Sequence, residues 1–179
     1  LDTGPVWSVA RTAIDEHDNF QTLHDRLAAL GASEVIRLLQ DFPPRVVAPS
    51  PQPDEGVTYA KKITKEDSRI DWTAPASHIA CKIRALDPFP GAQALLSGET
   101  VKLFDAHFTS KAAGEPLLKN PLPGQILKAD AQGLLVACGE GSVVIGAVQR
   151  PGAKRLGIRE FLNGRPVTAG QMLGSLAAA

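Results

Sequence analysis

The sequence predicts a mostly β second half, a small antiparallel barrel or sandwich, that follows a short piece with one strand and one or two helices. Five prolines within eleven residues, at 43, 44, 49, 51 and 53, separate the two parts. Between residues 92 and 149, apolar stretches recur at a spacing of about ten residues with Gly-bearing turns between them, which is typical of antiparallel β folds. Up to Glu55 there are four basic and nine acidic residues, and after it 15 basic and 10 acidic, so the two parts also differ in charge.

The first piece, residues 1–42, is predicted to be incomplete. Residues 6–10 read as a short strand after a Gly-Pro turn, and Thr22 is a plausible cap for a helix whose leucines recur at helical spacing. Gly31 and Ser33 are expected to interrupt this helix before helical spacing resumes to about Phe42. One strand and one or two helices cannot enclose a core, so this piece needs a sheet to lie on.

Residues 43–58 are predicted to form an extended linker, because proline at this density forbids helix and discourages sheet. In the domain that follows, residues 59–179, Thr73 is the expected N-cap of a helix whose apolar stripe ends at the Asp87–Gly91 turn. The expected strands are 92–96, 101–108, 125–129, 134–138 and 142–149, and a last short helix is expected at 158–162.

Several classes of protein are not predicted. No apolar run is long enough to span a bilayer. Cys81 and Cys138 lie in apolar surroundings and are expected to be buried, inert thiols in a reducing cytoplasm. The four histidines show no close pairing with cysteine or carboxylate, so no metal site is predicted.

Basic side chains in the second domain suggest contact with a polyanion, although a solvated charged face remains an alternative. Three lysines lie where the linker meets the domain, Arg84 precedes a Pro-x-Pro turn where it could equally cap a helix end, and further cations follow the last long strand. Most aromatic side chains are expected in the core, which favours contact with a duplex or a backbone over base stacking. The candidate binding residues are Lys61, Lys62, Lys65, Arg84, Lys154 and Arg155.

Several motifs resemble the carboxyl-terminal domain of the methionyl-tRNA formyltransferase family, over Leu1 to about Arg165. They are Ile70-Asp71-Trp72, Ile83-Arg84-Ala85-Leu86-Asp87-Pro88-Phe89-Pro90, Pro123-Gly124, residues 148–155 and Phe161-Leu162-Asn163-Gly164. The resemblance implies an OB-like open β-barrel with short helices, preceded by an incomplete α/β remnant of a Rossmann-like formyltransferase domain.

The resemblance also implies a reaction for the complete enzyme. It moves a formyl group from 10-formyltetrahydrofolate to the methionine amine of initiator methionyl-tRNA. Asp2 matches the catalytic acid of the family's Leu-Asp-x-Gly loop, whereas the partner Asn and His would precede Leu1. The 179 residues alone are therefore expected not to formylate and to bind no folate.

The expected partners are initiator methionyl-tRNA and a preceding catalytic domain. Lys62 matches a linker lysine that the resemblance places close to the tRNA. Neither DNA nor a membrane is expected. Three alternatives stay open at this point. They are part of a folate-dependent hydrolase or dehydrogenase, part of an amino-sugar formyltransferase, and a non-catalytic RNA-binding barrel.

Overall fold

The computed structural model describes residues 3–40, 48–109 and 120–176. The chain divides into two compact units, Leu1–Ile63 and Thr64–Ala179. The division lies after Ile63, whereas the sequence predicts the second domain to start at residue 59. Asp2 and the first two linker prolines lie outside the described residues.

The first unit contains one continuous helix, α1 (Phe20–Gln40). The predicted interruption is wrong: Gly31 lies inside the helix in open space, and the Ser33 hydroxyl donates to the Ala29 carbonyl at 3.0 Å. The predicted cap at Thr22 is also replaced, because Asn19 caps the helix. The Thr22 amide donates to Asn19 Oδ1 at 2.9 Å and the Asn19 amide donates to Thr22 Oγ1 at 3.1 Å, a reciprocal capping arrangement.

The strand predicted at residues 6–10 is absent from the described part of the chain, where Val6 makes only an isolated antiparallel bridge with Ser50. Polar contacts hold this segment to α1, since the Ser8 hydroxyl donates to Glu34 at 2.6 Å and accepts from Arg37 at 2.8 Å. No described residue of α1 is buried. The predicted α/β, Rossmann-like remnant is therefore not evident in residues 3–40.

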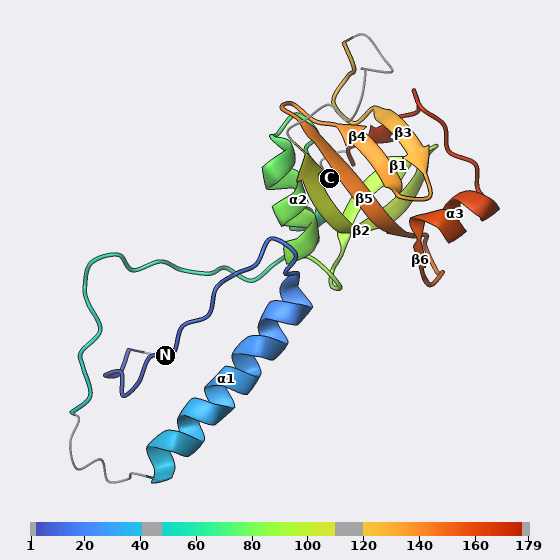
Figure 1. Ribbon diagram of the computed structural model, residues 1–179. Coiled ribbons are helices and arrows are strands. Elements are labelled where there is room, and N and C mark those ends of the chain that lie inside the picture. Colours follow the sequence, from blue (N-terminus) through green and yellow to red (C-terminus); the bar gives the residue numbers. More distant parts are fainter. Residues whose placement is uncertain (1–2, 41–47, 110–119, 177–179) are drawn as a thin grey trace. The chain divides into compact units, whose positions relative to one another are not determined.

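The second unit is the predicted β structure, a sheet with strand order β3-β4-β5-β2-β1-β7 in which β6 also pairs with β5 (Figure 1). The two ends of this order approach each other, because the Ile126 amide donates to the Gln171 carbonyl and the Leu173 amide to the Gly124 carbonyl, both at 2.8 Å. The sheet thus curls into a nearly closed barrel, as predicted. The strands are β1 (Ala92–Leu96), β2 (Glu99–Thr109), β3 (Ile126–Asp130), β4 (Gly133–Ala137), β5 (Ser142–Gln149), β6 (Arg155–Gly157) and β7 (Leu173–Gly174).

In the described residues of this unit, three short helices accompany the barrel: η1 (Glu66–Ser68), α2 (Ala76–Ala85) and α3 (Ile158–Gly164). Helix α2 packs against β2 and β5, and α3 lies beside β5 and β6 (Figure 1). The N-cap of α2 is Pro75, so the prediction of Thr73 is wrong. The amide and hydroxyl of Thr73 instead donate to Asp71 Oδ1 at 2.9 and 2.6 Å, which closes a side-chain turn ahead of the helix.

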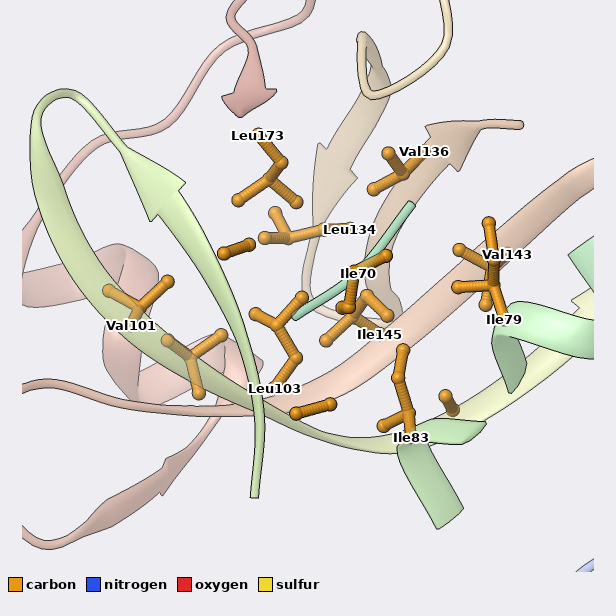
Figure 2. Close-up of a cluster of buried hydrophobic side chains, with 14 of the residues drawn as sticks. Ile70, Ile79, Ile83, Val101, Leu103, Leu134, Val136, Val143, Ile145 and Leu173 are labelled. Carbon is orange, nitrogen blue, oxygen red and sulfur yellow. The ribbon is translucent and has the colours of Figure 1, made fainter. Parts of the chain in front are cut away.

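The core fills the interior of the barrel with aliphatic side chains from the strands and from α2. Figure 2 shows Ile79 and Ile83 of α2 pointing toward strand residues such as Ile145. Burying each such side chain contributes roughly 1.5–3 kcal/mol. Cys138 belongs to this core, and burial raises the pKa of its thiol to about 11. Cys81 is exposed, so its predicted burial is wrong.

Candidate functional site

A row of polar side chains crosses the outer face of the barrel. Each member lies directly opposite the next across neighbouring backbone segments, from the residue after η1 through β1, β2 and β5 to β6. Three of the five members are cations and two are amides. In order across the sheet, the polar row consists of Arg69, Gln93, Lys102, Gln149 and Arg155.

The alternation of side chains along each strand places the polar row outside. On β2, Val101 and Leu103 are fully buried in the core, so Lys102 between them projects from the opposite face. On β1, Gln93 lies in the same way between two buried alanines. Because opposite residues of paired strands project from the same face, the polar row forms one continuous surface.

A groove of about 280 Å³ lies over the centre of the polar row. It is lined by Gln93, Thr100, Lys102, Gln149, Arg150, Pro151 and Gly152. One wall is the loop after β5, which turns through a hydrogen bond from the Ala153 amide to the Arg150 carbonyl at 3.1 Å. Gln149 fixes this loop to the row by donating from Nε2 to the Ala153 carbonyl at 2.8 Å, and the exposed Lys154 follows.

Arg155, at the end of the polar row, joins two parts of the fold. Its Nη1 lies 2.9 Å from Oδ1 of Asp87, a carboxylate whose side chain is only 3% exposed. Its guanidinium also lies 4.5 Å from the centroid of the Phe104 ring, a cation–π contact. A guanidinium carries five N–H donors and this side chain is 38% exposed, so Arg155 retains donors for a ligand.

Glu99 holds Arg150, which lines the groove together with Lys102. Arg150 Nε donates to Glu99 Oε1 at 3.0 Å, and Arg165 donates to the same carboxylate. These hydrogen bonds hold the pKa of Glu99 below its usual value. Arg150 is thereby kept at the groove although half of its side chain stays exposed.

Comparison with known proteins gives the family. The model of the family described as "Formyl transferase, C-terminal domain" matches residues 62–166, more than half of the chain. The chain belongs to the formyl transferase C-terminal domain family. The resemblance that the motifs indicated is thus confirmed, and the matched residues contain the whole polar row.

Similar full-length proteins carry the name methionyl-tRNA formyltransferase. The protein of Burkholderia thailandensis is 44% identical over 172 residues, which cover 96% of this chain and 51% of the relative. The protein of Acidovorax ebreus is 43% identical over 176 residues, covering 98% and 53%. The chain spans about half the length of these curated relatives.

Solved structures share the fold. The structure of HypX from Aquifex aeolicus in complex with tetrahydrofolic acid aligns over 93% of this chain and 29% of its own, with a TM-score of 0.67 and 22% identity. A variant of the same protein with substitutions A392F and I419F aligns over 99% of this chain, with a TM-score of 0.63.

Of the six binding residues that the sequence predicts, the structure brings Lys154 and Arg155 to the polar row. Lys65 is exposed just before η1, four residues from Arg69. Arg84 donates from Nη1 to the Ala106 carbonyl at 3.0 Å, so it links α2 to β2. Lys61 and Lys62 belong to the other compact unit and are exposed. Contact of these residues with tRNA stays a prediction.

The central members of the polar row were not predicted from the sequence. A signal for part of it exists, because the Ser97-Gly98 turn has positive φ at both residues and joins β1 to β2 directly. Such a two-residue turn sets Leu96 opposite Glu99, and hence Gln93 opposite Lys102. The pairing of Lys102 with Gln149 has no such local signal.

The formyl transferase C-terminal domain thus presents cations and amides on a surface suited to phosphate and sugar oxygens. Among residues 3–40, 48–109 and 120–176, no group of three or more His, Cys, Asp or Glu could hold a metal ion. No helix in the described part of the chain is long and apolar enough to cross a membrane.

Proposed function

We propose that the chain is the carboxyl-terminal part of a methionyl-tRNA formyltransferase. The complete enzyme would transfer a formyl group from 10-formyltetrahydrofolate to the methionine amine of initiator methionyl-tRNA, in the cytoplasm and at the start of protein synthesis. Two findings support this: the family assignment of residues 62–166 and the shared name of relatives that align with almost the whole chain. The hydrolase, amino-sugar and non-catalytic alternatives are not favoured by these relatives.

The chemistry of transfer belongs to the complete protein in this proposal. Asp2, as the catalytic carboxylate, would orient a histidine and assist proton transfer from the attacking amine. The folate itself supplies the formyl group when bound. The groove over the polar row does not suit its pterin ring, because its seven lining residues include no aromatic side chain. We therefore assign no described residue to the folate.

The described part of the chain would bind the RNA. The observation that carries this proposal is the polar row, in which cations alternate with amides beside a groove and further cations follow on the loop. Cations bind phosphate oxygens, and amides bond equally to sugar hydroxyls and phosphates. A surface of this kind positions an RNA backbone without reading its sequence.

The direct test is the salt dependence of initiator methionyl-tRNA binding by the full chain and by Lys102→Ala. Each neutralised phosphate contributes about 0.7 to 0.9 to the slope of log affinity against log salt. Lys102→Ala is expected to bind more weakly, and the magnitude of its salt slope is expected to be about one smaller than the parent's. A gel shift with an elongator tRNA tests whether the initiator is preferred.

Lys128→Ala is the matched control. Lys128 is also a lysine on a strand, although it is exposed whereas Lys102 is half-buried. It pairs with Asp130 on β3, which β4 and β5 separate from β2 in the sheet order. This variant is expected to bind with the parent's affinity and slope. Equal losses in both variants, or none in Lys102→Ala, would contradict RNA binding by the polar row.

A further inference from the structure

The Phe89 ring is 78% exposed beside the polar row, although most aromatic side chains were expected in the core. It is the most exposed phenylalanine in the described part of the chain. We propose that Phe89 stacks on an unpaired base of the RNA whose backbone lies on the polar row. This inference rests on the proposed RNA binding. It specifies that the bound RNA has an unpaired nucleotide next to the backbone held by the polar row.

The loop that carries Phe89 is fixed to the polar row at both ends. At its start, Asp87 is bonded to Arg155 at 2.9 Å. At its end, the Gly91 amide donates to the Leu86 carbonyl at 2.9 Å, and the stem of Lys102 passes over Gly91. An added Cβ at Gly91 would lie 2.8 Å from Lys102 Cδ, and the φ of +83° also favours glycine here.

These anchors bring Phe89 within reach of a backbone held by the polar row. Phe89 is two residues from Asp87 and two from Gly91, and consecutive Cα atoms are at most about 3.8 Å apart, so its Cα lies within about 8 Å of each anchor. Arg155 and Lys102, which contact those anchors, are members of the polar row. A single nucleotide could therefore meet a cation through its phosphate and Phe89 through its base.

The loop also restricts the backbone that carries the ring before any ligand arrives. Proline stands on each side of Phe89, and each proline ring fixes one backbone φ angle. A pre-arranged backbone loses little conformational entropy on binding, which favours affinity. Phe104 on the same outer face differs, because Arg155 covers it and it is only 2% exposed.

The charge around Phe89 favours RNA over an apolar protein surface as its partner. Lys102 and Arg155 flank the anchors of the loop, and Arg150 and Lys154 lie on the neighbouring loop after β5. An apolar protein surface would have to desolvate these cations without replacing their hydration. A nucleotide supplies a phosphate for the cations and a flat base for the ring.

The test compares two RNA probes on the full chain: a blunt-ended hairpin, and the same hairpin with a short unpaired 3′ extension. Phe89→Ala is expected to lower affinity for the extended hairpin about tenfold, the loss of one base stack, and to leave the blunt hairpin unaffected. Phe89→Trp, which keeps a ring for stacking, is expected to bind both probes as the parent does. Lys102→Ala is expected to weaken both.

The outcomes separate this inference from the proposed function. If Phe89→Ala binds the extended hairpin as well as the parent does, or loses equal affinity for both probes, the stacking role is wrong while RNA binding stands. A partner of Phe89 would then be sought among protein surfaces. If the parent binds neither probe, the proposed function itself fails. Because Phe89 is exposed, its variants are expected to keep the parent's circular dichroism spectrum.

Discussion

Arg155 is the side chain through which a loop, a strand and an aromatic ring of the second unit meet. The sequence predicts it as an RNA contact, and the structure adds that it bonds to the buried Asp87 and covers Phe104. A carboxylate as buried as Asp87 requires polar partners, since desolvation of a charge is costly. Arg155 therefore stabilises the fold at the same surface that we propose for RNA.

Arg155→Ala should lower the free energy of unfolding by about 2 kcal/mol, from the loss of one charged hydrogen bond and the cation–π contact. Arg155→Lys should lose less, because a lysine keeps the charge but not the planar group. Urea denaturation followed by circular dichroism measures both values.

Lys154→Ala is the control for this prediction, because the neighbouring Lys154 is exposed and forms no ion pair with another described residue. Its free energy of unfolding should stay within about 0.5 kcal/mol of the parent's. If Arg155→Ala were no less stable than Lys154→Ala, the anchoring role of Arg155 would be refuted.

At the scale of elements, the β-hairpins are the part that could be predicted from the sequence. Strands β1 and β5 have the predicted bounds, and β2, β3 and β4 differ by one or two residues at their ends. Apolar stretches at a regular spacing and the Gly-bearing turns between them are local signals, and they indicate these strands even where, as in β4, every residue is buried. The very short β6 and β7 were missed because three and two residues carry no readable alternation.

In helix α1, by contrast, the local signals led to a wrong prediction. Gly31 and Ser33 suggested a break, because glycine costs about 1 kcal/mol in a helix interior relative to alanine. The surrounding helix-forming residues and the Asn19 cap outweigh this cost. Apolar side chains of α1 such as Val35 and Ile36 are exposed, so in the described residues they do not pack into a hydrophobic core.

Gly31→Ala should therefore stabilise α1 by about 1 kcal/mol, because the added methyl group meets no atom within 4 Å and the backbone already has helical geometry. The measurement is the thermal loss of the 222 nm circular dichroism signal, which should shift to higher temperature.

Gly56→Ala is the matched control, since Gly56 is in the same unit and in equally open space but has a φ of +78°. That conformation disfavours alanine, so no gain is expected. A decreased helical signal in Gly31→Ala would indicate that Gly31 does end a helix, as the sequence suggested.

At the scale of the whole molecule, the candidate site shows the limit of prediction from the sequence. The polar row joins residues from 69 to 155, and its order depends on which strands are neighbours. The sequence suggested Lys154 and Arg155 as candidate binding residues because they are clustered along the chain. It did not identify Arg69 or Lys102, because each stands alone among residues of other kinds and gains meaning only from the register of the barrel.

The division into two units also belongs to this scale. The proline-rich segment and the change in charge both suggested two parts, and the structure divides the chain after Ile63. The curated relatives are about twice as long as these two units together.

Chemical acetylation of lysines with and without initiator methionyl-tRNA, read by mass spectrometry, tests the central claim most directly. If the outer face of β1, β2 and β5 binds RNA, Lys102 and Lys154 are protected in the complex, whereas Lys128 on β3 reacts equally in both samples. Protection of Lys128 together with unchanged reactivity of Lys102 would contradict the claim.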